Sequence, residues 1–178
     1  SKPQQTALDA VDDKVKNDYL LKYMLDVESR DSLLNTDLFK KPFDYTLNIA
    51  TDSAGATEPR QVDLIETFNY LIGLKVQKLN VKPDQGQAIV EGITTAGEKV
   101  LVIWRDCEKV DYNDLNKLCE KLRINPRDFE YDVLYVNGDH NIPQTITLEA
   151  ADGGITRTMK LRQIEDEFFR RMFACEEI

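Results

Sequence analysis

A run of five apolar residues at positions 100–104 (VLVIW) constrains the fold of this chain more than any other feature. A strand without polar alternation is typical of the centre of a sheet that is covered on both faces. A helical pattern follows from Asp111, a candidate N-cap, to about residue 123, and residues 131–136 (YDVLYV) have the character of a further strand. Because two parallel strands need a crossover connection, this order predicts a parallel pair.

A second helix is predicted by the signals at its two ends. Asp63 is a candidate N-cap, and Glu66 lies three positions further on, as in a capping box. Gly73 stands where the end of a helix favours a positive φ. Residues 164–173 and the residues from about 18 to 27 also carry apolar side chains at helical spacing. About four helices are therefore expected.

Period-two alternation predicts strands at residues 43–50, 74–81 and 88–94, and residues 51–60 are expected to form a loop because they contain Gly, Ser and Pro. Residues 145–149 and 155–161 flank an Ala-Asp-Gly-Gly turn signal and predict a hairpin. These elements predict an α/β fold, with α+β as the alternative: a single domain at 18–178 with a sheet of mixed direction and β-hairpins. The polar residues 1–17 are expected to be a flexible arm or linker, or a frayed helix.

Charge and cysteine content narrow the classes of function. The 178 residues carry a net charge of -9, which argues against a main DNA-gripping surface because phosphate neutralisation needs basic side chains, although a local basic patch stays open. The three cysteines show no CxxC spacing, so neither a disulfide scaffold nor a zinc site is expected. No signal peptide and no apolar run of membrane-spanning length is seen, so the expected location is the cytoplasm, without a membrane partner.

Catalytic motifs are missing from the sequence. The single histidine, His140, is expected to be a loop residue, and GxSxG, HExxH and the phosphate-binding glycine motifs do not occur. A metal-dependent nuclease would draw on Glu91, Lys99 and Asp106, but Glu98 directly precedes Lys99, and alternation would place the two on opposite faces of a strand. We therefore expect no catalytic, cofactor-binding or metal-binding residue in this chain.

Four residues are candidates for contact with a partner or with DNA: Trp104, Arg105, Arg170 and Arg171. Trp104 could stack on a base and Arg105 could hold a phosphate, whereas the alternative is a core tryptophan beside a surface pair of Arg105 and Asp106. Arg170 and Arg171 lie among aromatic residues of the last helix, and that aromatic stripe is more typical of a core than of a binding groove.

Six blocks resemble, in this order, one known family. They are residues 18–30 (DYLLKYMLDVESR), 33–49 (LLNTDLFKKPFDYTLNI), 62–74 (VDLIETFNYLIGL), 100–106 (VLVIWRD), 129–139 (FEYDVLYVNGD) and 164–173 (IEDEFFRRMF). They are similar to the segment after the catalytic domain of adenine-specific DNA methyltransferases, the modification subunits of type III restriction-modification systems. The resemblance covers roughly residues 18–176.

That resemblance implies a parent enzyme that transfers a methyl group from S-adenosylmethionine to N6 of adenine in DNA. The family's FxGxG-type cofactor motif and its [DNS]PP[YFW] tetrapeptide are absent, so no catalytic residue is carried over. The implied role is a non-catalytic C-terminal domain that serves subunit assembly or positioning on DNA. The implied partners are a catalytic domain that precedes residues 1–17 in the same chain, a second copy through the parent, a restriction subunit, and DNA through the parent.

Two alternatives stay open on the sequence alone. The first is a domain that reads DNA directly, with a basic stripe from Arg105, Lys109, Arg123, Arg127, Arg170 and Arg171. The second is an independent metal-dependent nuclease or hydrolase, which would need carboxylates that converge on a divalent ion.

Overall fold

The computed structural model describes residues 39–44, 46–50, 57–61, 63–121, 131–148 and 157–174. These residues belong to two compact units: a hairpin within residues 46–62, and a larger unit that contains residues 39–44 and everything described from residue 63 onward. The arm expected at 1–17 and the helix expected near 18–27 lie outside the described residues. The domain boundaries predicted from the sequence stay a prediction.

The hairpin consists of β1 (Thr46–Ala50) and β2 (Thr57–Gln61), which pair antiparallel with Thr46 opposite Gln61. The prediction that residues 51–60 are all loop is wrong for residues 57–60, which belong to β2. The prediction counted Pro59 as a loop signal. A proline is tolerated in a two-stranded hairpin, however, because each strand has one unpaired edge. The strand predicted at 43–50 also begins later, because Pro42–Asp44 form the short 3₁₀ helix η2.

The larger unit is built on a six-stranded sheet in the order β3-β4-β5-β6-β8-β7. The strands are β3 (Leu74–Lys82), β4 (Gln87–Thr94), β5 (Lys99–Arg105), β6 (Val133–Val136), β7 (Thr145–Leu148) and β8 (Arg157–Gln163). β5 is parallel to β6 and β6 is parallel to β8, while the other pairs are antiparallel. The predicted α/β class, the mixed direction of the sheet and the parallel β5–β6 pair are therefore confirmed.

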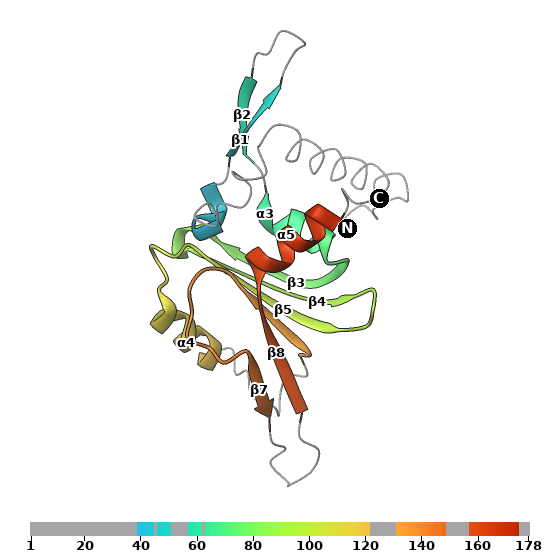
Figure 1. The fold of residues 1–178 in the computed structure, drawn as a ribbon. Coiled ribbons are helices and arrows are strands. Elements are labelled where there is room, and N and C mark those ends of the chain that lie inside the picture. Colours follow the sequence, from blue (N-terminus) through green and yellow to red (C-terminus); the bar gives the residue numbers. More distant parts are fainter. Residues whose placement is uncertain are drawn as a thin grey trace, which may run out of the picture. The chain divides into compact units, whose positions relative to one another are not determined.

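Three α-helices lie within the described residues: α3 (Leu64–Leu71), α4 (Tyr112–Lys121) and α5 (Ile164–Ala174). The predicted caps are present, since Asp63 accepts the N–H of Glu66 at 3.0 Å and Asp111 accepts that of Asp114 at 2.9 Å. Gly73 follows α3 with φ 63°. In Figure 1, α3 and α5 lie on one face of the sheet and α4 lies on the other.

Both faces of β5 are buried, as its continuous apolar run predicts. On the α4 face, a core forms around Leu115, with side chains from β5, β6 and β8: Leu101, Ile103, Leu134, Val136, Met159 and Leu161. On the opposite face, aromatic rings from five segments meet: Phe39, Phe68, Trp104, Tyr135 and Phe168. The described helices include none that is both long and apolar enough to cross a membrane.

Candidate functional site

The carboxyl ends of β5, β6 and β8 meet at one edge of the sheet, where α/β folds commonly place their ligand sites. Arg105 ends β5, Asn137 and Gly138 follow β6, and Gln163 ends β8 just before α5 begins. Arg105 and Asn137 are the first polar residues after the apolar runs of β5 and β6. Together with Glu165 at the start of α5, these residues form the carboxyl-end junction (Arg105, Asn137, Gly138, Gln163 and Glu165).

The guanidinium of Arg105 lies inside the fold, with 1 % of the residue exposed. Its Nε donates to the carbonyl of Asn137 at 3.1 Å, its Nη1 donates to that of Val110 at 3.3 Å, and its Nη2 donates to that of Asp139. Three loop carbonyls thus share one planar donor fork, which suits Arg because its donors have fixed geometry. Arg105 joins the loops after β5 and β6.

Asn137 connects the junction to the N-terminal part of the unit. Its Oδ1 accepts the backbone N–H of Arg105 at 2.9 Å, and its Nδ2 donates to the carbonyls of Phe39 at 2.8 Å and of Arg105 at 2.9 Å. The side chain is fully buried, and each of its polar atoms has a partner. A buried amide that is satisfied in this way fixes the positions of the strands around it.

Gly138 and Glu165 close the junction on the side of α5. The N–H of Gly138 (φ 73°) donates to both carboxylate oxygens of Glu165, at 3.1 and 3.3 Å. Gln163 donates to the carbonyl of Gly138 at 2.8 Å and also to Glu165. Burial raises the pKa of Glu165, and the hydrogen bonds from Gln163 and Gly138 oppose that effect only in part.

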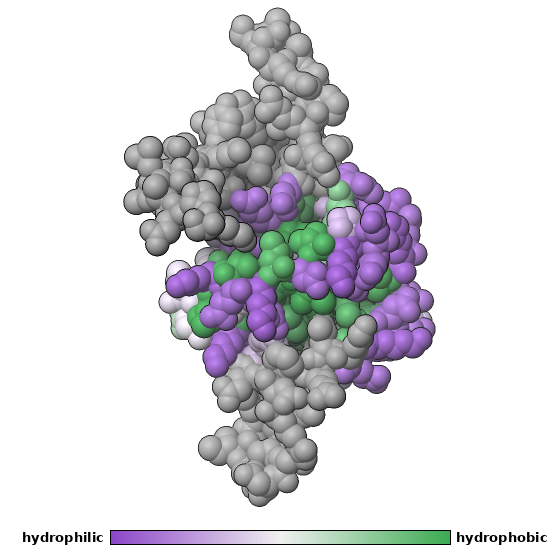
Figure 2. Space-filling model, turned by 180° about the vertical axis from the view of Figure 1, so that it is seen from behind, coloured by the Kyte–Doolittle hydropathy of each residue, from purple (hydrophilic) through white to green (hydrophobic). Residues whose placement is uncertain are grey.

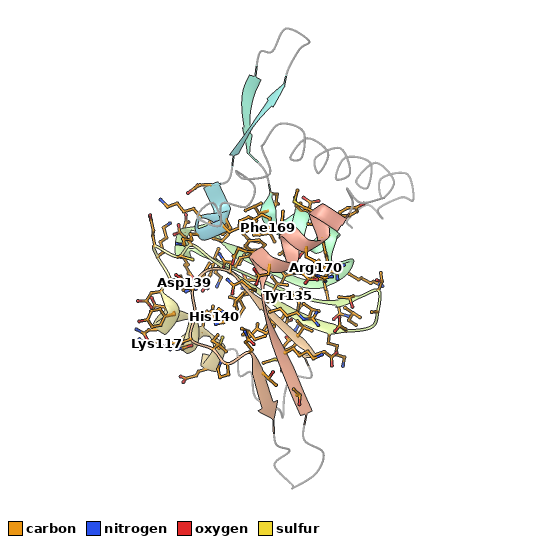
Figure 3. All side chains as sticks on the ribbon, viewed as in Figure 1. Lys117, Tyr135, Asp139, His140, Phe169 and Arg170 are labelled. Atoms are coloured by element: carbon orange, nitrogen blue, oxygen red, sulfur yellow. The ribbon has the colours of Figure 1, made fainter. Side chains whose placement is uncertain are left out.

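His140 lies in the loop after β6 (Figure 3) and takes part in the same network. The N–H of Ile142 donates to its Nδ1 at 3.2 Å, so Nδ1 is the acceptor and Nε2 carries the proton. Nε2 can then donate to Gln163 Oε1, which lies 3.1 Å away. Both ring nitrogens thus have structural partners, in agreement with the loop role expected for this residue.

Trp104 occupies the core, with none of its surface exposed. Its ring stacks on Phe39 with centroids 6.5 Å apart and meets Phe68 edge-on at 5.8 Å. The core tryptophan is the alternative that the sequence left open, whereas a surface pair of Arg105 and Asp106 is not found, because both residues are buried. Neither Trp104 nor Arg105 offers an exposed group to DNA or to a partner.

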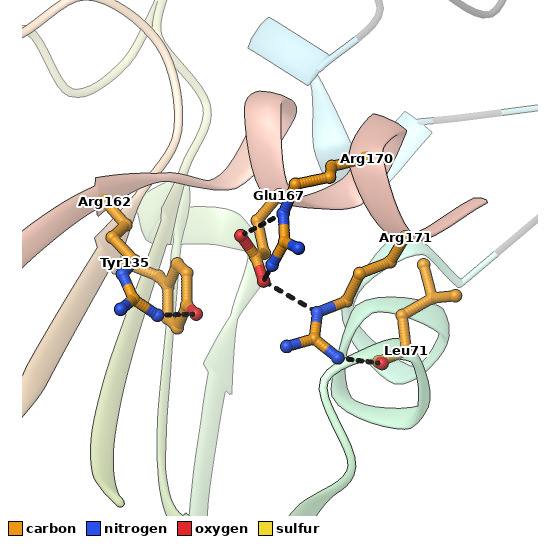
Figure 4. A network of polar contacts seen from close by, with 6 residues as sticks. All are labelled: Leu71, Tyr135, Arg162, Glu167, Arg170 and Arg171. Atoms are coloured by element: carbon orange, nitrogen blue, oxygen red, sulfur yellow. Dashed lines mark hydrogen bonds and ion pairs between the residues drawn. The ribbon is translucent and has the colours of Figure 1, made fainter. Parts of the chain in front are cut away.

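Arg170 and Arg171 lie on α5 and share one acceptor, Glu167 (Figure 4). Arg170 Nη2 lies 2.6 Å and Arg171 Nε 2.7 Å from Glu167 Oε1, and Arg171 also donates to the carbonyl of Leu71 on α3. Burial favours the neutral acid, but the two arginines outweigh it and lower the pKa of Glu167. Of these two arginines, Arg170 is the more exposed, with 66 % of its side chain accessible.

Two hollows flank the junction. One, of about 590 Å³, lies where β7 no longer covers the outer edge of β8, and its lining includes His140, Gln163, Glu167 and Arg170. The other, of about 510 Å³, is lined on one side by Lys40 and Lys41 and on the other by Tyr112. Cys107 also borders it, and burial raises the pKa of that thiol, which makes it a poor nucleophile.

The residues considered for a nuclease do not converge. Lys99 begins β5 and Asp106 follows its last residue, so the length of the strand separates them. The Glu91 carboxylate accepts a hydrogen bond from the hydroxyl of Tyr131, which lies just before β6, and is 3.7 Å from Lys78 Nζ. Within the described residues, no three His, Cys, Asp or Glu side chains gather in a way that would hold a metal ion. Arg123 and Arg127 of the expected basic stripe lie outside those residues.

The surface of the described part has one feature that the sequence did not single out. Its exposed large hydrophobic residues are Val76, Leu79, Val81 and Tyr112, and three of these four lie on the edge strand β3. Figure 2 shows one face of the molecule, where hydrophobic residues gather in the middle and hydrophilic residues surround them. The period-two pattern of residues 74–81 predicted a strand, but it could not show that this strand ends the sheet.

Comparisons with models of protein families, with curated proteins and with solved structures found no match to this chain.

Proposed function

We propose that this chain is the non-catalytic C-terminal domain of an adenine-N6 DNA methyltransferase, the modification subunit of a type III restriction-modification system. The proposal rests on the six ordered sequence blocks, which span most of the chain. In this proposal the parent enzyme binds S-adenosylmethionine through a separate catalytic domain and works in the cytoplasm, where its DNA lies. The domain itself contributes to subunit assembly and to positioning on DNA.

The observation that carries a non-catalytic role is the closure of the carboxyl-end junction. Three of the blocks supply it, through Arg105, through Asn137 and Gly138, and through Glu165. Their polar groups bond one another and backbone carbonyls, whereas a catalytic group must reach a substrate atom within hydrogen-bonding distance. A junction that is bonded inward in this way favours a rigid support for other domains over a reaction centre.

The charge of the chain also favours a protein-facing role. A net charge of -9 repels the phosphate backbone, and Arg170 and Arg171, the two candidates for DNA contact that are not buried, already share the carboxylate of Glu167. A homodimer of the parent and a docked restriction subunit are the partners that this role requires. DNA then contacts mainly the rest of the parent.

Methyl transfer to duplex DNA tests the proposal. The assay compares the full parent, the parent without residues 18–178, and this chain alone, with labelled S-adenosylmethionine as the donor. We expect activity in the full parent, a loss in the truncated parent together with a change in its oligomeric state, and none in this chain alone. Methylation by this chain, or its own tight binding of the donor, would contradict the proposal.

A matched pair of variants in the parent separates assembly from direct DNA contact. R170A/R171A removes the two arginines of α5, and K117A/K160A removes two exposed lysines elsewhere in the domain. We expect the same DNA affinity and the same salt dependence for both variants. A weaker affinity with a shallower salt slope for R170A/R171A alone would identify a direct DNA contact instead.

A further inference from the structure

Every residue of β3 after Leu74 is exposed, although β3 is the longest strand of the sheet. It runs over nine residues, pairs with β4 on one side, and ends the sheet on the other within the described part of the chain. An edge strand directs about half of its backbone N–H and C=O groups away from its neighbour, where another chain can bond to them. Natural edges are usually short, covered, or protected by charged side chains and bulges, and this edge is long for a strand that nothing described covers.

The register of β3 places its apolar side chains on one face of the sheet and its lysines on the other. Val76, Leu79 and Val81 lie opposite Gly92, Val90 and Ala88, which in turn lie opposite Val100, Val102 and Trp104 of β5. Residues that lie directly opposite each other share a face of the sheet. The apolar side chains of β3 therefore extend the face that carries Trp104 and the aromatic core.

A β-bulge at Gln77 makes this sorting possible. Val76 lies opposite Gly92 and Lys78 lies opposite Glu91, so Gln77 is the extra residue between them. Without it, strict alternation would place Leu79 and Val81 on the face opposite to Val76. The bulge keeps all three apolar side chains on one face, where between 40 % and 56 % of each residue is exposed.

The other face of β3 is basic. Lys75, Lys78, Asn80 and Lys82 lie opposite Ile93, Glu91, Ile89 and Gln87, on the α4 side of the sheet. Lys78 has a carboxylate within 3.7 Å, that of Glu91. The chain has a net charge of -9, so the three lysines on one face of this strand form a local positive patch on an acidic protein.

From this arrangement we infer that the free edge of β3 binds an extended polypeptide segment of a partner, in which acidic side chains alternate with apolar ones. The segment adds a seventh strand to the sheet, with main-chain hydrogen bonds to β3. Its apolar side chains cover Val76, Leu79 and Val81, and its carboxylates lie against Lys75, Lys78 and Lys82. The inference goes beyond the proposed function and does not depend on it.

A second copy of β3 does not fit the same edge. In an antiparallel pair of identical strands, side chains on the same face oppose each other, and three of the four residues on the basic face are lysines (Lys75, Lys78 and Lys82, with Asn80). Like charges that lie directly opposite are destabilising. Charge complementarity therefore selects an acidic partner over a second copy of this chain.

A peptide-binding experiment on the 178-residue chain tests the inference. The probe is a fluorescein-labelled nine-residue peptide of alternating glutamate and valine, acetylated and amidated at its ends, measured by fluorescence anisotropy at low salt. We expect saturable binding that weakens as salt is added, because exposed charges are screened. A peptide with lysine in place of glutamate, and one with proline in its centre, should bind at least about ten-fold more weakly.

Charge reversal provides the matched control. K75E/K82E changes two lysines of the basic face, and K117E/K160E makes the same change in net charge at exposed positions on α4 and β8. We expect the first variant to weaken the Kd by at least about five-fold and the second by less than about two-fold. Circular dichroism and thermal unfolding of each variant show whether it is folded.

Amide chemical shifts locate the bound peptide. The largest changes on addition of the acidic peptide should fall on residues 74–82. Four results would overturn the inference: no binding up to millimolar peptide, equal weakening by the two charge-reversal variants, shift changes that lie away from β3, or self-association of the chain through the β3 edge.

Discussion

The carboxyl-end junction and the β3 edge differ in the exposure of their polar groups. At the junction, Arg105 and Asn137 are buried, and their polar groups bond to backbone groups of the same unit. At the edge, strand β3 exposes lysines, apolar side chains and one row of backbone groups. Polar residues that gather at one end of a sheet therefore need not form a binding site. When they hydrogen-bond to groups of the same unit, no donor or acceptor is left for a ligand or partner.

Arg105→Ala gives the strongest test of this comparison, since it removes a buried side chain that donates to three loop carbonyls and leaves a cavity. We expect the free energy of unfolding to fall by about 3–5 kcal/mol, measured by urea denaturation. Arg170→Ala, which removes an exposed arginine, should cost no more than about 1 kcal/mol. Equal effects would mean that the buried Arg105 contributes no more to stability than an exposed arginine does.

Gly138→Ala tests whether the junction is closely packed. A Cβ at this position would lie 2.5 Å from Cys107 Sγ and would also require an unfavourable positive φ. We expect a loss of about 2–4 kcal/mol in thermal or chemical unfolding. Gly97→Ala is the control, because φ there is also positive but no atom lies within 4 Å, so only the conformational cost of about 1 kcal/mol remains.

Glu165→Gln tests the buried carboxylate through the pH dependence of stability. Because burial raises the pKa of Glu165 above its ordinary value of 4.5, its protonated form is favoured by folding. That contribution is complete below pH 4.5 and is lost as the pH rises through the folded-state pKa. Relative to the wild type, the variant should therefore gain stability as the pH rises from about 4 to about 7, measured by urea titration at each pH.

A control separates this effect from the change in net charge. Glu120→Gln removes the same charge from an exposed position on α4. A relative gain of the same size and pH dependence in both variants would show that net charge, and not the buried site, produces it.

The smallest effect is expected at the β3 edge. K75A/K82A should change the free energy of unfolding by less than about 0.5 kcal/mol, because both side chains are exposed and surface substitutions rarely cost more. Differential scanning calorimetry of the variant checks this. A large loss would mean that the lysines support the fold itself.

Much of the architecture could be predicted because it depends on local signals. The cap at Asp63, the end of α3 before Gly73 and the central place of β5 all follow from residues within one element. The β2 strand was missed because Pro59 is a turn signal along the sequence but an acceptable residue at an edge.

The candidate site was harder to predict because its chemistry depends on distant residues. Arginine is usually a surface residue, and Arg105 can be buried only because the carbonyls of Val110, Asn137 and Asp139 accept its hydrogen bonds. No pattern in the sequence near Arg105 predicts that these carbonyls lie close together in the fold. The exposure of Leu79 likewise depends on the order of strands in the sheet and not on the residues beside it.

The hydrogen bond from Asn137 to Phe39 joins residues 98 positions apart, and the one from Arg171 to Leu71 joins residues 100 apart. Contacts of such long range slow folding, because the entropy of closing a long loop is lost before the contact forms. During synthesis, β3, β4 and β5 can pair as a meander before β6 exists. The edge of β5 that pairs with β6 then stays open until residues 133–137 have left the ribosome, and an open strand edge in this interval exposes the nascent chain to misfolding.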